Sequence, residues 1–434
     1  MDNKIQITQA RIIEWYQHYD GNVCVSFSGG KDSTVLLHIA RKMYPDIPAV
    51  FSNTGLEYAE IQRFVKSWDN VDIIVPKMRF DEVISTYGYP IIGKEVAEAI
   101  YYARRIRSHG VQVERERERE SKKTSSLLPL RVTAEPYSKA SGWGRDALQT
   151  TGTIGKQTAW KRMEIGGGQT TRQKQSELLG RRAGVVRDGK TGEGDAFSNP
   201  TEQFGEKSMF NKEKWLPLCR DLPILISHYC CYKMKKSPMH QYQKQRGYAP
   251  ILATLAEESR VRKQAWMRHG CNAFESKNPM SQPMSFWTEQ DVLAYLVRYN
   301  VPICSVYGEI VSMGADGNAY PPTDLTGRPL CNLKCTGCQR TGCVFCAFGA
   351  HLEKGSERRF LQLAKIEPRK YEYAIGGGQW SDNPFYDPTA PKMDGEWQNW
   401  NPKKIWTPSK KGLGMGKVFD MVNEIYGEDF IRYK

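Results

Sequence analysis

The sequence predicts an α/β fold built on a doubly wound parallel sheet, and two observations support this. Short apolar runs at 23–27, 49–52 and 71–75 alternate with helical patterns at about 32–43 and 57–68. Such alternation is typical of parallel strands joined by crossover helices. A glycine-containing turn joins the first strand to the first helix, and folds of this class bind ligands beyond the carboxyl ends of their strands.

That turn, the glycine loop (residues 28–33), reads Ser-Gly-Gly-Lys-Asp-Ser. Glycines let the backbone approach an anion closely, and the free amides at a helix start favour negative charge. The lysine adds a positive charge, and the serines add hydroxyl donors. We therefore expect a nucleotide phosphate here; the alternative is a turn that only reverses the chain. The residues are Ser28, Gly29, Gly30, Lys31, Asp32 and Ser33.

The sequence pattern of a folded domain resumes at Trp215, after a long polar stretch. Residues 222–226 are apolar, the next segment has helical character, and residues 250–256 predict another strand. Thr-Glu-Gln-Asp at 288–291 is typical of a helix start, because apolar residues at helical spacing follow it. A short helix is expected near 416–426, within a C-terminal region rich in Trp, Pro, Lys and Gly.

Composition limits the classes of function. The chain has 434 residues, 40% of them apolar, which allows two or three domains and a sizeable core. It has no run of about 18 apolar residues and no signal peptide at its start, so we expect a cytoplasmic protein without membrane contact. The formal net charge of +14 suggests polyanionic partners, nucleotides or nucleic acid.

Residues 104–214 form a basic insertion that is poor in aliphatic residues. It holds 23 Lys and Arg against 14 Asp and Glu. It cannot bury much apolar surface by itself, so we expect it to be mobile or ordered by a partner. Three interpretations are open: a solvated spacer, a surface that binds nucleic acid or an acidic protein, and a fused element. The expected division is 1–103 (nucleotide-binding half), 104–214 (insertion), 215–302 (second half of the α/β domain), 303–350 (cysteine-rich segment) and 351–434 (C-terminal extension).

Eleven cysteines in a chain without an export signal argue against a disulfide framework. Five of them fall within sixteen residues, and clustered intracellular cysteines are more often metal ligands than structural thiols. These five are Cys331, Cys335, Cys338, Cys343 and Cys346.

Several segments together resemble one family. The glycine loop resembles the Ser-Gly-Gly-Lys-Asp-Ser loop of the PP-loop ATP-pyrophosphatase superfamily, whose members usually cut ATP between the α and β phosphates to adenylate a substrate. Further segments in the same order resemble the phosphoadenosine phosphosulfate (PAPS) reductase family. The resemblance covers about 20–103 and 215–350 and implies a Rossmann-like, adenine nucleotide α-hydrolase-like fold. The further segments are 53–60, 228–238, 255–262, 283–302 and 341–346.

The resemblance implies which residues bind the nucleotide. The second motif (residues 53–60) begins with Asn where the family has Asp. Lys31 is expected to neutralise charge on the phosphates, and Asp32 and Glu57 to help place Mg²⁺; the alternative for both carboxylates is helix capping and surface charge. The basic loop (residues 255–263) is expected to contact a second phosphate or a sulfate. The remaining expected ligands are Asn53, Thr54, Gly55, Arg260, Arg262 and Lys263.

The resemblance also implies a metal centre. Relatives that use adenosine phosphosulfate (APS) hold a [4Fe–4S] cluster with a Cys-Cys pair and a later Cys-x-x-Cys. The matching residues here are Cys230, Cys231, Cys343 and Cys346. Four thiolates suit an iron–sulfur cluster or zinc. Cys335 and Cys338 are alternative ligands, because two close pairs can hold one metal unaided.

The reductases of the family attack the sulfonate with a cysteine near the C-terminus, and this sequence has no cysteine after Cys346. We therefore expect an enzyme that uses ATP or a related adenine nucleotide to activate a substrate or transfer sulfur to it. The alternatives are a PAPS or APS reductase with a displaced nucleophile and a non-catalytic subunit that binds nucleotide or nucleic acid. Pairing of chains is expected only by analogy with the family.

Overall fold

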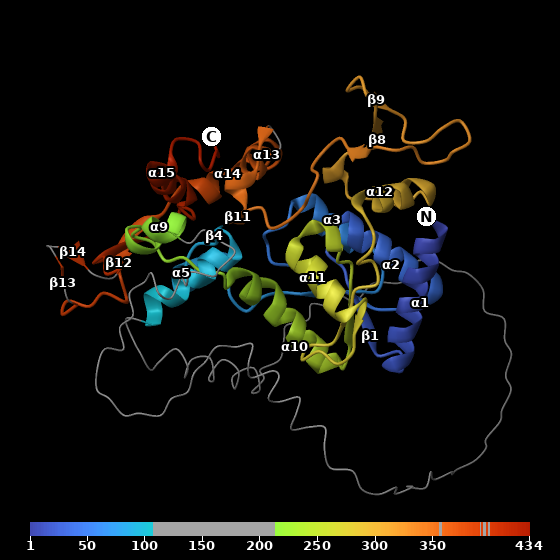
Figure 1. Cartoon of the computed structure of the whole chain (residues 1–434), viewed down its shortest axis with the longest axis horizontal. Coiled ribbons are helices and arrows are strands. Elements are labelled where there is room, and N and C mark those ends of the chain that lie inside the picture. The colour runs from blue at the N-terminus through green and yellow to red at the C-terminus, as the bar shows by residue number, and fades with distance from the viewer. Residues whose placement is uncertain (107–212, 356–357, 391, 394–395, 398–399) are drawn as a thin grey trace, which may run out of the picture. The chain divides into compact units, whose positions relative to one another are not determined.

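One six-stranded sheet carries the segments that the sequence marks for nucleotide binding. In the computed structural model its order is β3-β2-β1-β5-β7-β6, with β6 antiparallel to β7 and the other neighbours parallel (Figure 1). The structure describes residues 1–106 and 213–434, apart from 356–357, 391, 394–395 and 398–399. The predicted α/β class is confirmed. The strands are β1 (Val23–Ser26), β2 (Ala49–Ser52), β3 (Val71–Ile74), β5 (Ala249–Leu252), β6 (Asn272–Ala273) and β7 (Met280–Ser281).

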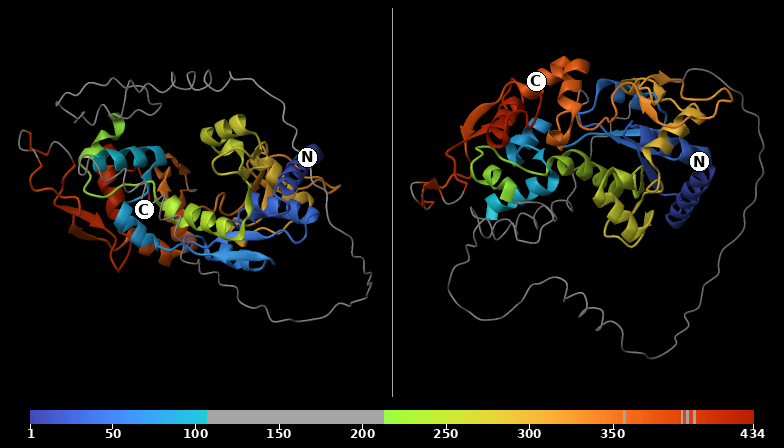
Figure 2. Two further views of the ribbon diagram at one scale, coloured as in Figure 1. Left: turned by 90° about the horizontal axis from the view of Figure 1, so that it is seen from below. Right: turned by 45° about the horizontal axis from the view of Figure 1, so that its top comes forward.

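Helices make up much of the remaining described chain. They are α1 (Asp2–His18), α2 (Lys31–Met43), α3 (Ala59–Lys66), α4 (Phe80–Tyr87), α5 (Lys94–Ile106), α9 (Leu216–Arg220), α10 (Ser237–Arg246), α11 (Arg260–His269), α12 (Glu289–Arg298), α13 (Arg359–Ile366), α14 (Pro368–Ile375) and α15 (Met415–Tyr426). α2 contacts both α1 and α12, and α14 contacts both α13 and α15. Figure 2 shows the chain from two further directions.

Alternate residues of the central strands face different helical layers, as the two-residue period of a strand requires. Val23 and Val25 of β1 belong to the large core, which also contains Val35 of α2. Cys24, between the two valines, packs instead with Tyr242 of α10. The sheet is therefore covered on both faces, which accounts for the continuous apolar character of its strands.

Short strands make smaller sheets around this centre. The pairing of β4 with β11 is parallel and sets Ala347 opposite Ile91, which brings the segment after the second Cys-x-x-Cys beside the first hundred residues. β8 pairs with both β9 and β10 in antiparallel fashion. The strands are β4 (Ile91–Ile92), β8 (Ile310–Met313), β9 (Ala319–Tyr320), β10 (Leu333–Cys335), β11 (Ala347–Phe348), β12 (Gln379–Asp382), β13 (Lys392–Met393), β14 (Glu396–Trp397) and β15 (Lys404–Thr407).

Arg104 links the two chain segments that flank residues 107–212 through hydrogen bonds. Its Nε donates to the carbonyl of Cys219 (2.9 Å) and its Nη2 to that of Leu222 (3.1 Å). Its guanidinium lies 4.2 Å from the ring centroid of Trp400. Burial lowers the pKa of Arg104 to about 10, and interactions with Cys219 and Asp221 oppose this fall. The carbonyls therefore satisfy a cation that the apolar surroundings would otherwise exclude.

The structure differs from the sequence-based expectation at some element ends. The strand expected at 250–256 ends at Leu252, and the chain then leaves the sheet and forms a 3₁₀ turn at Ala256–Glu258. The helix expected from 57 begins at Ala59, because residue 57 braces the preceding turn.

The basic insertion lies outside the described residues apart from its ends, and the expected division into segments stays a prediction. Within the described part of the chain, no helix combines the length and apolar composition needed to cross a bilayer.

Candidate nucleotide site and cysteine cluster

The glycine loop makes a sharp turn between β1 and α2. Gly29 has φ = +71°, and a Cβ there would stand 2.9 Å from Cγ2 of Val65. Glycine is therefore favoured both by backbone conformation and by space. Ser33 Oγ accepts a hydrogen bond from Ser28 N (3.2 Å) and donates one to Gly30 O (2.9 Å). These bonds shape the loop from within, while Ser28 remains exposed to a ligand.

The lysine of the loop is paired with a carboxylate from a distant part of the chain. Lys31 is 5% exposed, and its Nζ donates to Oε1 of Glu289 over 2.7 Å. Glu289 is the first residue of α12, whose first turn is fixed by a capping box between Thr288 and Asp291. The ring centroid of Tyr307 lies 5.3 Å from the same Nζ. A phosphate entering the loop therefore competes with Glu289 for the ammonium group.

Asp32 lies among several charges beside the loop. Burial raises the pKa of its carboxyl above the usual range, and the charge of Glu289 adds to this. Lys31, Arg340 and Arg262 oppose the rise but do not cancel it. The structure thus surrounds this first-turn carboxylate with the cations of the glycine loop and the basic loop.

The second motif follows β2, the neighbour of β1, and is braced by Glu57. This side chain is 4% exposed. Its Oε2 accepts from Thr54 N (3.1 Å) and its Oε1 from Thr54 Oγ1 (2.7 Å). Asn53 Oδ1 accepts from Gly55 N (3.2 Å). Both Glu57 oxygens are engaged inside the motif, so this geometry supports bracing of the turn more directly than contact with Mg²⁺.

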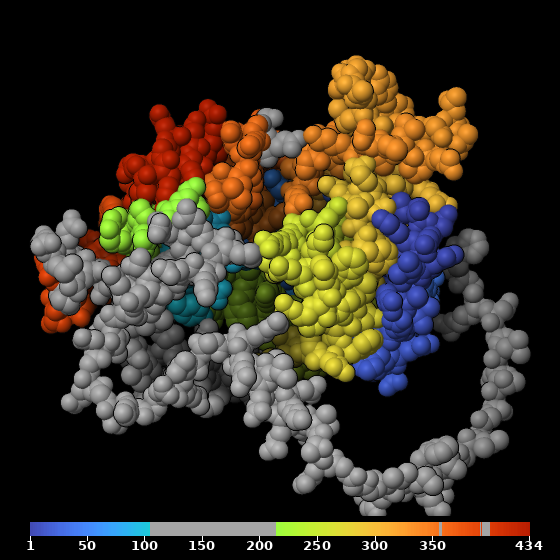
Figure 3. Space-filling view, in the orientation of Figure 1, coloured from blue at the N-terminus to red at the C-terminus, as the bar shows by residue number. Residues whose placement is uncertain are grey.

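The basic loop follows β5, which pairs with β1 on the side opposite to β2. The Arg262 guanidinium pairs with the carboxylate of Glu258, and Arg340 Nη1 stands 3.8 Å from that carboxylate. Arg262 therefore joins the charged group around the glycine loop. Arg260 and Lys263 lie at the exposed start of α11, a helix without any buried residue. Figure 3 shows this part of the chain, in yellow, at the surface.

The four cysteines singled out by the resemblance, here called the thiol set, come together from two distant segments. Cys230 and Cys231 open a helical segment that continues as a π-helical turn, and their Sγ atoms are 4.0 Å apart. Cys343 and Cys346 form a turn closed by a 3.0 Å bond from Cys346 N to Cys343 O. The pKa of Cys230 is raised by its hydrogen bond with Cys231, by burial and by the charges of the other three. The four thiols therefore share one electrostatic environment.

Cations surround the thiol set. Hydrogen bonding from Cys230 lowers the pKa of Cys231 to about 6; burial opposes this shift and two lysines support it. An arginine Nη1 donates to the carbonyl of Cys346 over 2.7 Å. Positive charge of this kind stabilises thiolates, the form of cysteine that binds metals. The cations are Lys94, Lys235 and Arg359.

Lys235 joins the thiol set to the second motif. Its Nζ is 3.7 Å from Oε1 of Glu57. Burial alone lowers its pKa, but the charges of Cys343, Glu57 and Cys231 outweigh burial and leave the pKa raised. A backbone bond from Val344 N to Leu56 O (2.8 Å) links the same two segments.

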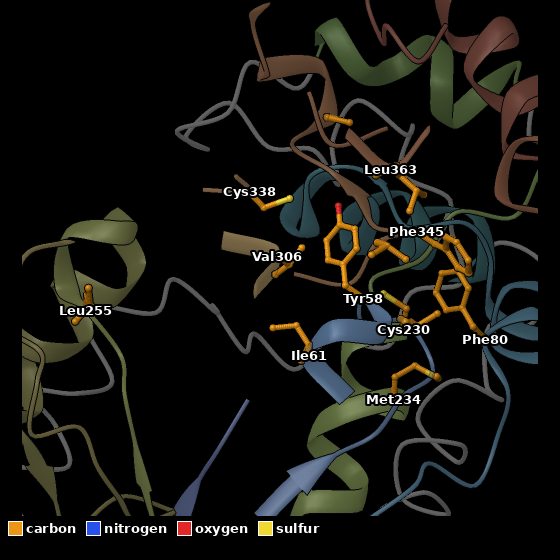
Figure 4. Close-up of a cluster of buried hydrophobic side chains, with 14 of the residues drawn as sticks. Tyr58, Ile61, Phe80, Cys230, Met234, Leu255, Val306, Cys338, Phe345 and Leu363 are labelled. Carbon is orange, nitrogen blue, oxygen red and sulfur yellow. The ribbon is translucent and has the colours of Figure 1, made fainter. Parts of the chain in front are cut away.

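The alternative ligands lie in other surroundings. The surroundings of Cys335 include Lys31 and Glu289, and those of Cys338 include Tyr58 at the start of α3. Figure 4 shows Cys338 beside the hydroxyl of Tyr58, with Cys230 below that ring. The structure thus brings Cys335 to the glycine loop and Cys338 to the second motif. The eleven cysteines, all within the described residues, form no disulfide with one another, and no group of three His, Cys, Asp or Glu in this part of the chain is arranged to hold a metal ion.

A pocket of about 420 Å³ opens beside the second motif. Residues 53–55 form a polar wall, and Phe80, Phe345 and Tyr373 contribute aromatic rings. The Phe345 centroid lies 6.0 Å from that of Phe80 and 6.1 Å from that of Tyr373. Figure 4 shows Phe345 and Phe80 as neighbours. Phe345 stands between the two cysteines of the second Cys-x-x-Cys, so the pocket and the thiol set share one turn.

Sequence reasoning missed several residues of this site. Lys235 had a local signal, because it follows Cys231 by four residues and so lies on the same face of a helical segment. Glu289 had none that tied it to Lys31, because their contact spans 258 positions of the chain. Tyr373 lies in the C-terminal extension, where the sequence shows no motif.

Comparison with known proteins agrees with this geometry. The chain matches the phosphoadenosine phosphosulfate reductase domain over residues 22–87 and 196–348, about half of its length. A sheet of this topology, with its glycine loop after the first strand, defines an α/β nucleotide-binding protein. The chain belongs to the PAPS reductase family, which binds adenine nucleotides and acts in sulfur metabolism.

One curated relative shares a short stretch. The chain is 35% identical over 69 residues to "Uncharacterized protein MJ0973" of Methanocaldococcus jannaschii. The match covers 15% of this chain and spans 17% of the length of that relative.

Proposed function

We propose that the chain is an enzyme that binds ATP or a related adenine nucleotide at the glycine loop and activates a substrate or transfers sulfur to it. One observation carries this proposal: Lys235 contacts Glu57 of the second motif and lies in the field of Cys343 and Cys231. This contact supports the proposal that the expected nucleotide site and the expected cysteine centre are adjacent.

The loop residues have defined tasks in this proposal. The free amides at the start of α2 hold the phosphates in line, and Lys31 leaves Glu289 to neutralise the charge that develops on them. Asp32 helps to place Mg²⁺, and Arg262 with Arg340 contacts a second phosphate or a sulfate. Glu57 acts through Thr54, because both of its oxygens are engaged there.

The thiol set fits an iron–sulfur cluster in its chemistry. The four thiols come from two segments and interact electrostatically, although among the described residues they are not arranged to hold a metal ion. The three neighbouring cations would compensate the negative charge that a thiolate-bound cluster carries. Cys230, Cys231, Cys343 and Cys346 would hold a [4Fe–4S] cluster, with zinc as the alternative. Such a cluster, when bound, supplies electrons or tunes the charge beside the nucleotide.

A thiol-dependent PAPS or APS reductase is the second candidate, and one observation favours it. Cys338 lines a cavity of about 400 Å³ together with Gly308 and Thr336. A thiol that faces a cavity beside the second motif is a candidate substitute for the C-terminal cysteine of the reductases.

The test begins with protein purified without oxygen. Iron and acid-labile sulfide are measured, and ATP, APS and PAPS are then supplied side by side with a thiol donor. Pyrophosphate from ATP supports the proposal, and sulfite from APS or PAPS supports the second candidate. Neither product, with salt-sensitive binding to DNA or RNA, would mean a non-catalytic subunit.

Two variants sharpen this test. Lys31→Ala is expected to lower product formation by about 100-fold, the usual cost of losing a group that stabilises developing charge. Cys343→Ser is expected to lose iron and sulfide, whereas Cys271→Ser, at a half-buried thiol outside the thiol set, keeps both. A colourless, zinc-loaded protein would show that the iron assignment is wrong.

A further inference from the structure

Helix α14 lies beyond the residues that match the family, yet it is fastened to the second motif. Glu367, just before this helix, accepts a hydrogen bond from Ala59 N at the start of α3 (2.7 Å). Lys370 Nζ donates to the carbonyl of Glu57 (2.7 Å) and pairs with Glu367 Oε2 (2.6 Å). The C-terminal extension is thus held against the segment that follows β2.

This attachment places Tyr373 in the wall of the pocket beside residues 53–55. Its ring is tilted by 46° to that of Phe345. Leu413, also from the extension, lines the same pocket. The pocket volume of about 420 Å³ falls in the range of roughly 300–1,000 Å³ that is usual for small-molecule sites. Its aromatic and aliphatic side chains suit a flat ring system, and the paired side chains of Arg79 and Asp81 add polar groups to the lining.

The sheet relates this pocket to the glycine loop. β1 and β2 are parallel neighbours, with Val25 opposite Ala49, so the loop after β1 and residues 53–55 after β2 emerge at the same edge. Adjacent strands lie about 4.8 Å apart, which is shorter than the span from a nucleotide base to its phosphates. One nucleotide can therefore place its charged tail at Lys31 and its base in the pocket.

We propose that Tyr373 forms a stacking wall for the purine base of the bound nucleotide, so that the C-terminal extension of this chain completes the site. This inference rests on the nucleotide site proposed above. Tyr373 is a binding residue in this arrangement, and Glu367 and Lys370 are positioning residues that hold its helix.

Binding measurements on the full chain test the inference. ATP, PAPS and inorganic tripolyphosphate are titrated into the wild type and into Tyr373→Ala, Tyr373→Phe and Glu372→Ala. Tyr373→Ala is expected to weaken binding of the nucleotide about tenfold, since stacking of a base on an aromatic side chain has this order of effect. Tripolyphosphate binding stays unchanged, because it lacks a base. Tyr373→Phe keeps the ring and binds within about twofold of the wild type, as does Glu372→Ala, an exposed neighbour on the same helix.

The outcomes separate this inference from the proposed function. If Lys31→Ala weakens ATP and tripolyphosphate but Tyr373→Ala weakens neither, the phosphate site stands and the stacking wall is wrong. If Lys31→Ala changes nothing, or no adenine nucleotide binds the wild type, the nucleotide site itself is wrong.

A measurement on the wild-type chain tests the inference even if Tyr373→Ala fails to fold. Light-induced crosslinking with 8-azido-ATP, followed by peptide mapping, is expected to label the peptide of α14 or the turn with Phe345. Labelling confined to other peptides overturns the inference.

Discussion

Lys31 and Glu289 form an ion pair that a nucleotide must break. The contact is 2.7 Å long, with the lysine side chain buried and the glutamate side chain 45% exposed. We predict that Glu289→Gln tightens ATP binding roughly two- to fivefold, since a partly exposed ion pair contributes up to about 1 kcal/mol. Calorimetric titration of both proteins checks this, with the exposed Glu424→Gln on α15 as control. Weaker binding by Glu289→Gln would show instead that this carboxylate positions Lys31.

The pH dependence of an Asp32 variant can separate two roles for this side chain, a functional carboxylate and a helix cap. Burial raises its pKa in the folded state, so its contribution to stability is full below the unfolded pKa and is lost as the pH rises through the folded pKa. We predict that Asp32→Asn raises the melting temperature at pH 7.5, that the gap to the wild type narrows as the pH falls toward about 4, and that product formation drops.

Thermal melts at several pH values, with assays at pH 7.5, measure this behaviour. A lower melting temperature for Asp32→Asn at neutral pH would favour the capping interpretation. An Asp20→Asn variant, at an exposed turn before β1, is the control for a general loss of charge.

At the scale of the element, the turn between β1 and α2 depends on Gly29. A Cβ there meets Val65 at 2.9 Å and Ile61 at 3.0 Å, and φ is +71°. We predict that Gly29→Ala lowers the free energy of unfolding by about 2–4 kcal/mol, from backbone strain together with overpacking against α3. Gly270 is the matched control, because its φ is +69° and no atom lies within 4 Å of the place where a Cβ would stand.

Denaturant titration of both alanine variants separates the two effects. Gly270→Ala is expected to lose only the strain contribution, about 1–2 kcal/mol. Equal losses in the two variants would show that contact between the loop and α3 adds nothing.

The elements that the sequence predicts well are those whose signal is local. The strands β1, β2 and β3 and the start of α12 follow from apolar runs and a capping sequence of a few residues. The pairing of Lys31 with Glu289 could not be predicted in this way, because it depends on the packing of α2 against α12. The same holds for Tyr373, which reaches the pocket only because α14 is fastened to residues 57 and 59.

At the scale of the whole molecule, the site is assembled from segments that no single motif contains. The glycine loop comes from the first strand, the thiol set from two later segments, and one pocket wall from the C-terminal extension. The family resemblance led us to expect these four cysteines as one ligand set, because their order in the chain follows the family, and that assignment stays a prediction. It could not predict the extension, which lies outside the matched residues.

The stability of the whole molecule should depend on three histidines whose folded-state pKa is lowered. Burial lowers the folded-state pKa of His38, His240 and His351, and the charges of Lys42, Lys236 and Lys214 respectively add to this. Because its pKa is lower in the folded state, each histidine contributes to stability above its pKa in the unfolded chain, about 6.5. This contribution is lost as the pH falls through its pKa in the folded state. We predict that the free energy of unfolding declines as the pH is lowered from about 6.5.

His351 offers the sharpest check of this pH dependence. Its ring stacks on Phe430 with centroids 5.2 Å apart, and Trp215 lies 5.7 Å away, so His351→Phe keeps the aromatic contacts and removes the titrating group. Denaturant titrations between pH 5 and pH 8 are expected to show a shallower decline for His351→Phe than for the wild type. The two proteins should differ most at the acid end, where protonation of the half-buried His351 ring destabilises the folded wild type. Parallel curves would mean that His351 keeps its ordinary pKa and that the acid sensitivity arises elsewhere in the chain.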